Sequence, residues 1–165
     1  MYDTHRRLAL VAIGVALLVV GSASAVPADR VLVAEDAETG ERYLTVPVSD
    51  GSVVAIEYTH SVEKTRVYDE YTVRGDRLEM TRMEFESYGW GLPSDANVTR
   101  ENGTFVYDPP GNYSRVTVAP GATAGHNLHV NSTTYNLVAR TKENGVHLFV
   151  TRRSALSAAI ETRNL

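Results

Sequence analysis

Apolar and polar side chains alternate along most of the chain beyond residue 30, and turn-forming residues interrupt the alternation at short intervals. A repeat of two residues is typical of a β-strand with one buried face, whereas a helix repeats about every 3.6 residues. The connections are too short to hold crossover helices, so neighbouring strands must pair mostly antiparallel. The sequence therefore predicts an all-β fold, either an antiparallel β-sandwich or a small barrel.

The predicted strands are rich in Val, Tyr, Thr and Phe, and clusters of Gly, Asn, Asp and Pro separate them. They cover residues 31–33, 43–48, 53–60, 65–73, 78–85, 104–107, 115–118, 127–130, 135–139 and 146–151. The apolar positions change parity between Met80 and Met83, which indicates a β-bulge near Thr81 and Arg82. Beyond the N-terminal segment, a short helix over residues 154–163 is the only helix we expect.

The N-terminal segment has the pattern of a secretory signal. Arg6 and Arg7 precede an apolar run, and small residues with an A-x-A pattern end at Ala25. The uncharged run continues to Val26 and approaches the ~20 residues that span a bilayer, so an uncleaved anchor is the alternative. We therefore expect residues 1–25 to be a signal peptide or membrane anchor, and residues 26–165 to form a single extracytoplasmic domain, exported to the cell surface or held at the membrane.

Composition narrows the possible partners and chemistry. The chain has 165 residues, 20 acidic against 16 basic side chains, and a net charge of −4, and its arginines are scattered, which argues against binding nucleic acid. The absence of cysteine excludes disulfides and thiolate chemistry. Four Asn-x-Ser/Thr sequons predict glycosylation in an exported protein. They begin at Asn97, Asn102, Asn112 and Asn131.

Several polar residues stand in or beside apolar strands. His60 ends the apolar row of strand 53–60, and the polar connector that follows is expected to fold Glu63 and Lys64 back over it in a tight hairpin. The next strand carries Asp69 and Glu70 on opposite faces, so one carboxylate is buried near aromatic rings. These groups are expected to form either a contact site or an internal salt-bridged network that fixes strand register.

Two further segments are candidate sites. The glycine-containing segment 87–93 holds the only Trp and is expected to contact a ligand or to form a tight turn. His126 and His129 lie three residues apart, so they face opposite sides of a strand and predict no metal site. His60 and Ser61 likewise face apart, and no nucleophile elbow is present. The sequence thus favours a non-enzymatic role without a cofactor, with an envelope enzyme as the least favoured alternative.

Three segments together resemble the domain-of-unknown-function family 1850. They read YTHSVEKTRVYDEY at 58–71, FESYGWGLP at 85–93 and AGHNL at 124–128, within a likeness that covers roughly residues 31–150. Two positions depart from the pattern of the family. Arg66 replaces a usual Pro, which we expect to loosen the turn, and Trp90 replaces a usual Ala.

Members of this family are short exported proteins, often encoded beside permeases of tripartite ATP-independent periplasmic (TRAP) transporters of the TAXI class. The resemblance implies a binding or docking accessory to such a transporter, with its permease or its solute-binding protein as partner, and it assigns no catalytic residues. The alternative is a structural cell-envelope glycoprotein domain with no ligand. The residues expected to contact a ligand or partner are His60, Ser61, Glu63, Lys64, Glu70, Ser87, Gly89, Trp90, Gly91, Leu92, Pro93 and His126.

Overall fold

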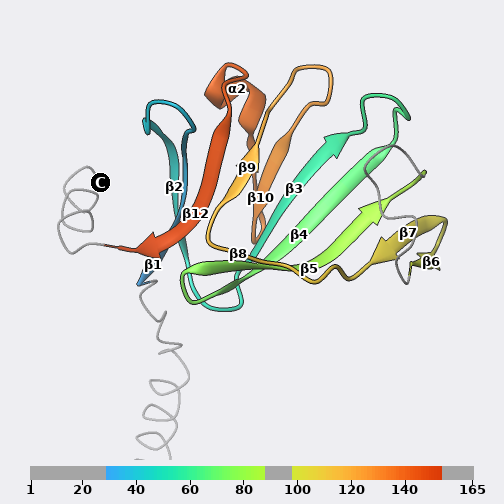
Figure 1. Cartoon of the computed structure of the whole chain (residues 1–165), viewed down its shortest axis with the longest axis horizontal. Helices are drawn as coiled ribbons and strands as arrows, with labels where there is room; N and C mark the ends of the chain where they lie inside the picture. The colour runs from blue at the N-terminus through green and yellow to red at the C-terminus, as the bar shows by residue number, and fades with distance from the viewer. Residues whose placement is uncertain (1–28, 88–97, 154–165) are drawn as a thin grey trace, which may run out of the picture.

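The computed structural model describes residues 29–87 and 98–153, which form two antiparallel β-sheets (Figure 1). The smaller sheet has the order β2-β1-β12-β9 and consists of β1 (Arg30–Asp36), β2 (Arg42–Val48), β9 (Val116–Val118) and β12 (Val146–Arg152). The larger sheet has the order β11-β10-β3-β4-β5-β7-β6, with β8 paired to β5 beside this path. Its strands are β3 (Val53–Thr59), β4 (Arg66–Arg74), β5 (Arg77–Phe85), β6 (Thr99–Glu101), β7 (Thr104–Tyr107), β8 (Asn112–Tyr113), β10 (Asn127–Val130) and β11 (Thr133–Asn136).

One apolar core lies between the two sheets. Leu32 of β1 and Leu148 of β12 pack with Val54 of β3 and Leu128 of β10, and each of these side chains is 1% exposed or less. Burial of alternate residues from both sheets explains the repeat of two in the sequence. The all-β antiparallel prediction is confirmed. The sheets do not close into a barrel, because each keeps two edge strands in the described part of the chain.

The predicted β-bulge is present in β5. Glu70 of β4 pairs with Arg82, but the next residue, Tyr71, pairs with Met80, so Thr81 is the extra residue on β5. The bulge keeps Met80 on the same face as Met83, because these residues pair with Tyr71 and Asp69, which share one face of β4. The parity change in the sequence therefore located this irregularity correctly.

The predicted strand 135–139 is wrong beyond Asn136. The chain instead turns into α2 (Leu137–Thr141), whose N-cap Asn136 accepts a hydrogen bond from the Ala139 N–H at 2.8 Å. Leu137 is fully buried and fixes this short helix against the core. A cap and a single buried turn carry too little periodicity to be recognised in the sequence. Strands β6 and β8 were not predicted, because both are short and all their residues are exposed, so neither shows an alternation of apolar and polar side chains.

Two other predicted elements lie outside the described residues. They are the signal or anchor over residues 1–25 and the helix over residues 154–163. Within residues 29–87 and 98–153, the structure has no helix of the length and apolar character that crossing a membrane requires.

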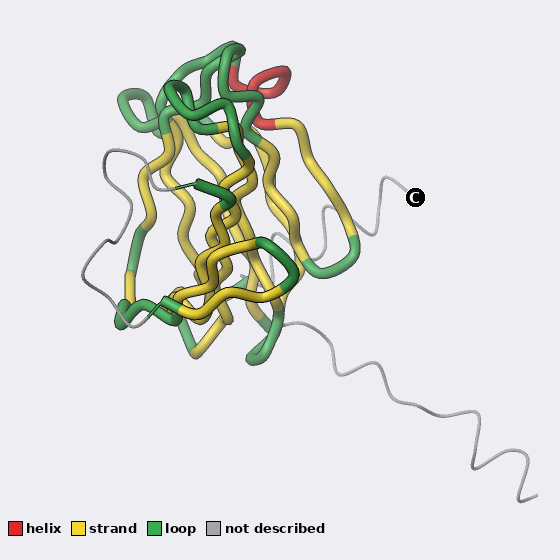
Figure 2. The backbone as a smooth tube through the Cα atoms, turned by 90° about the vertical axis from the view of Figure 1, so that its right-hand side faces the viewer, coloured by secondary structure: helices red, strands yellow, loops and turns green. Residues whose placement is uncertain are grey.

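The two ends of the domain differ. We call one end the loop end. It carries the 60–65 turn, the 119–126 loop and α2, which gather at the same end of the strands (Figure 2). The other, which we call the terminal end, holds the first described residue, Asp29, whose carbonyl accepts the N–H of Arg153. Arg30 also bonds Asp76 there at 3.1 Å. Both ends of the described chain therefore lie opposite the loop end (Figure 1).

Candidate functional site

The 60–65 turn is built around His60. Its N–H donates to the Thr65 carbonyl at 2.8 Å, and its carbonyl accepts the Lys64 N–H at 2.9 Å. Its Nδ1 accepts the backbone N–H of Glu63 at 3.1 Å, so the imidazole holds the turn from within. Lys64 adopts a positive φ of 58°, which closes the hairpin. The predicted tight connection is therefore present.

The tip of this turn presents side chains to solvent. Ser61, Glu63 and Lys64 are exposed, and Val62 is 66% exposed. Only one other large apolar side chain of the described residues, Tyr113, is classed as exposed. An apolar side chain held outward by an ordered backbone is a feature of contact surfaces.

Two other segments meet the turn at the loop end. Ser87 lies next to it, because its Oγ is 3.0 Å from the Thr65 Oγ1. The 119–126 loop is joined to the end of β3 by the hydrogen bond from the Thr59 N–H to the Ala124 carbonyl, at 2.8 Å. Three segments far apart in the sequence therefore converge here. The structure places six of the predicted contact residues at this end: His60, Ser61, Glu63, Lys64, Ser87 and His126.

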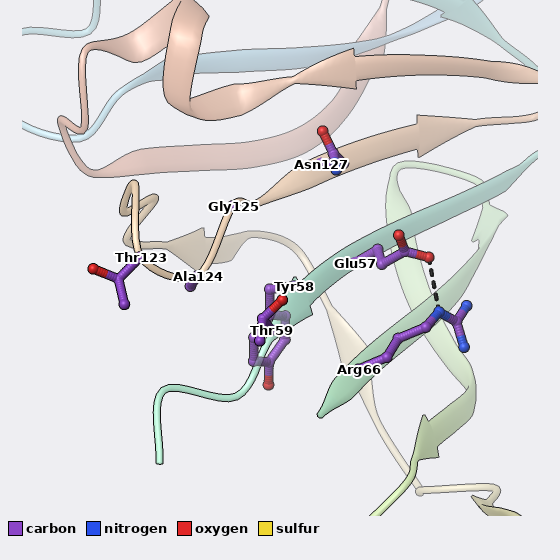
Figure 3. Close-up of a pocket in the computed structure, with 8 residues that line it drawn as sticks. All are labelled: Glu57, Tyr58, Thr59, Arg66, Thr123, Ala124, Gly125 and Asn127. Carbon is purple, nitrogen blue, oxygen red and sulfur yellow. Dashed lines mark hydrogen bonds and ion pairs between the residues drawn. The ribbon is translucent and has the colours of Figure 1, made fainter. Parts of the chain in front are cut away.

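A pocket of about 260 Å³ opens at the loop end, on the outer face of the larger sheet (Figure 3). Glu57 pairs with Asn127, and Thr59 pairs with Arg66, so these four side chains project from one face. The 119–126 loop forms the remaining wall. The lining residues are Glu57, Tyr58, Thr59, Arg66, Thr123, Ala124, Gly125 and Asn127.

Arg66 is held rigidly beside this pocket. Its Nε donates to Glu57 Oε2 at 2.9 Å and its Nη1 to Glu84 Oε2 at 2.9 Å. The guanidinium lies 4.7 Å from the centre of the Tyr68 ring, within cation–π range. We expected Arg66 to loosen the turn, but it begins β4 and the turn is closed by hydrogen bonds.

The ion pairs continue across the outer face. Arg82 donates to Glu84 and to Glu101, each at 2.8 Å. A second pocket of about 250 Å³ lies beside this pair. Glu57, Glu84 and Glu101 outnumber the two arginines, so this row of charges is slightly acidic.

Glu70 does not join the loop-end residues. It pairs with Ala55, five residues before His60 on β3, which places it roughly 16 Å from the turn at ~3.3 Å per residue. Its Oε1 accepts from the Thr81 hydroxyl at 3.3 Å on the outer face. The predicted cluster of His60, Glu63, Lys64 and Glu70 is therefore split, because a strand carries its residues steadily away from the turn.

Residues 54–137 match the model of the family described as "Domain of unknown function (DUF1850)". The chain belongs to this family. The matched segment begins in β3 and ends at the first residue of α2, so it contains the 60–65 turn and the whole lining of the loop-end pocket. No curated protein and no solved structure matches the chain.

The two histidines near β10 of this DUF1850 domain face opposite sides, as their spacing predicts. His126 stacks on the Tyr58 ring with 5.0 Å between centroids, and burial lowers the pKa of its imidazole. His129 Nδ1 lies 3.0 Å from the Thr134 hydroxyl on the outer face. Among residues 29–87 and 98–153, no three His, Cys, Asp or Glu side chains are close enough to hold a metal ion.

Asp69 is the carboxylate of the DUF1850 domain that faces the interior. It pairs with Ile56 and Met83 on the inner face of the larger sheet, and its Oδ1 is buried with no hydrogen-bond partner among the described residues. Burial raises the pKa of its carboxyl to about 6. Its charge also contributes to the raised pKa of Tyr58, which burial shifts to about 12.

The other predicted contact residues and one sequon lie outside the described part of the chain. These are Gly89, Trp90, Gly91, Leu92, Pro93 and Asn97. The remaining sequons of the DUF1850 domain differ in their surroundings. Asn131 Oδ1 accepts the Val53 N–H at 3.1 Å, and Asn112 Oδ1 accepts from the Arg77 Nε. Asn102 is exposed in the turn between β6 and β7, with a positive φ of 50°.

We predict that, of the three sequons in the described residues, Asn102 has the highest glycan occupancy, because its side chain makes no hydrogen bond with the other described residues and a transferase can reach it. Glycopeptide mass spectrometry of protein from native membranes measures the occupancy. Thr104→Ala, which destroys the sequon but keeps Asn102, is the control and should remove the glycan. A glycan on Asn131 with Asn102 unmodified would contradict the prediction.

Proposed function

We propose that this protein is an exported, membrane-associated docking accessory of a TRAP-type transporter of the TAXI class, and that the loop end is its contact surface. The transporter link comes from the resemblance of segments 58–71, 85–93 and 124–128 to the family. The observation that carries the docking role is the hydrogen-bonded turn that holds Val62 66% exposed among the exposed polar side chains of Ser61, Glu63 and Lys64. A rigid apolar side chain at the centre of a polar rim is the usual composition of a protein contact.

The position of the loop end favours one class of partner. The described chain begins at Asp29, at the terminal end of the domain. An anchor formed by the apolar residues that precede it would hold the terminal end near the membrane and direct the loop end away from it. Such an orientation suits contact with an extracytoplasmic solute-binding protein more than contact with the membrane-embedded part of a permease.

The test is capture of partners by the full chain. The protein, tagged at its C-terminus and expressed in its native cells, is purified from solubilised membranes, and TRAP components in the eluate are quantified by mass spectrometry. We expect a TAXI-class solute-binding protein with the wild type, and roughly a tenfold loss with Val62→Asp, because the variant places a charge in a desolvated contact. Ser132→Asp, in the exposed turn at the terminal end, is the matched control and should leave capture unchanged.

Two outcomes would overturn the proposal. One is an eluate of the wild-type chain that contains no TRAP component. The other is equal recovery of the solute-binding protein with Val62→Asp and with wild type, which would exclude the turn as the contact. The first outcome, in a chain whose sequons carry glycans, would favour the structural cell-envelope glycoprotein instead.

A further inference from the structure

We infer that the loop-end pocket binds a small, neutral, hydroxyl-rich molecule, a polyol about the size of a single sugar ring. This site is separate from the exposed turn that we propose for docking. The pocket lies on the outer face of the larger sheet, beside the 119–126 loop, whereas Val62 is at the tip of the turn. The inference therefore holds or fails independently of the transporter partner.

The walls of the pocket come from segments that are far apart in the sequence and are held together by hydrogen bonds. Its walls come from the end of β3, the start of β4 and the 119–126 loop, which the hydrogen bond from the Thr59 N–H to the Ala124 carbonyl holds together. Most of its lining belongs to segments 58–71 and 124–128, which carry the family resemblance; only Glu57 and Thr123 fall outside them. Figure 3 shows the Glu57–Arg66 pair on one side and the loop residues on the other.

The pocket retains hydrogen-bonding groups that the protein does not use. The side chain of Asn127 and the hydroxyls of Thr59 and Thr123 make no hydrogen bond to another described residue. Glu57 engages Arg66 through Oε2 alone, which leaves Oε1, and Arg66 uses Nε and Nη1, which leaves Nη2. The pocket therefore offers donors and acceptors side by side. A hydroxyl group, which donates one hydrogen bond and accepts others, matches this mixture.

The paired charges in the pocket disfavour an ionic ligand. Glu57 and Arg66 compensate each other at 2.9 Å, so neither an anion nor a cation finds an unmatched charge. An anion near Arg66 would also meet Glu84, which bonds the same guanidinium at 2.9 Å. A cation would have to compete with Arg66 for Glu57. A neutral ligand can bond to both side chains and leave the ion pair intact.

The volume sets the size of the ligand. At about 260 Å³ the pocket is smaller than the ~300–1,000 Å³ of sites for drug-sized molecules. A single ring with several hydroxyls suits this space better than a longer oligosaccharide.

Nuclear magnetic resonance of the full chain, labelled on its backbone nitrogens and purified in detergent, tests the inference. The probes are myo-inositol and D-glucose, each titrated to about 100 mM, with L-glutamate and putrescine as charged comparisons. We expect the neutral probes to shift the amide signals of Thr59, Gly125 and Asn127. Asn127→Ala and Glu57→Gln should each weaken the binding by about fivefold, the effect of one hydrogen bond. Glu101→Gln, in the ion pair beside the second pocket, is the matched control and should bind as wild type does.

If neither polyol shifts these three signals at about 100 mM, the pocket does not bind this class. Shifts of equal size with L-glutamate or putrescine would show that charge, and not hydroxyl chemistry, governs the site. Wild-type affinity in Asn127→Ala would place the binding elsewhere. Because Asn127 makes no side-chain hydrogen bond to another described residue, this variant should fold normally.

Discussion

Replacing Asp36 by alanine is expected to lower the melting temperature of the domain by about 10 °C. This carboxylate is 6% exposed at the end of β1 and accepts four hydrogen bonds. Its Oδ2 accepts from the Tyr43 hydroxyl at 2.6 Å and from Asn144 Nδ2 at 3.1 Å. Its Oδ1 accepts the backbone N–H groups of Thr39 and Glu38. Its loss removes the acceptor of the Tyr43 hydroxyl and of the two backbone N–H groups, and one of the two acceptors of Asn144 Nδ2, where the β1–β2 hairpin meets the chain before β12.

The same residue predicts a dependence on pH. The hydroxyl of Tyr43 and the two backbone N–H groups hold the pKa of the Asp36 carboxyl well below its usual range. A lowered folded-state pKa means that the stabilisation is present above the unfolded pKa, near 3.8, and is lost as the pH falls further. Thermal unfolding followed by circular dichroism should therefore show wild type and Asp36→Ala converging in strong acid.

The control for this comparison is Glu38→Ala, which removes an exposed carboxylate from the same turn and should leave the melting temperature within about 2 °C of wild type. An Asp36→Ala variant as stable as this control would contradict the prediction. So would a difference between wild type and Asp36→Ala that grows as the pH falls below 3.8.

Replacing Asp69 by asparagine is expected to have the opposite effect and to raise the free energy of unfolding by about 2 kcal/mol at pH 8. The buried Oδ1 of Asp69 has no partner among the described residues, and burial raises the carboxyl pKa from 3.8 to about 6. Above pH 6 the folded protein must hold an unpaired charge in its interior. Asparagine has nearly the same shape and no charge.

The pH dependence identifies the cause. A raised folded-state pKa means that the penalty is absent below the unfolded pKa, near 3.8, and grows as the pH rises through about 6. Urea unfolding should therefore show a gain for Asp69→Asn at pH 8 and almost none at pH 4. Glu70→Gln, the next residue on the outer face, is the control and should show no such dependence. A gain of equal size at both pH values would exclude the buried charge as the cause.

The alternation of buried and exposed side chains along a strand decided which parts of the fold could be predicted from the sequence. Alternation is a strong signal wherever one face of a strand is buried, and it located β3, β4 and β5 together with the bulge at Thr81. It failed at Leu137, where a single capped turn of helix follows a strand directly. It also failed for Asp69 and Glu70, because either register buried a carboxylate and only the packed sheets show which face is inside.

The candidate site was predicted in part. His60 was identified because a titratable ring followed an apolar row, and the turn after it forms as expected. Its imidazole, however, accepts backbone hydrogen bonds of its own turn, and Glu70 lies far along the strand. Arg66 and Asn127 were not proposed as site residues. Their contribution to one pocket depends on strand pairing between β3, β4 and β10.

The sequence by itself determined the class of fold, most of the strands and membership of the family, because each depends on local alternation or on contiguous motifs. The tertiary structure alone decided which segments meet. The 60–65 turn, Ser87 and the 119–126 loop are distant in the chain, and they converge because β3 pairs with β4 on one side and β10 on the other. Such long-range pairing results from the burial of a shared core, and no short stretch of residues encodes it.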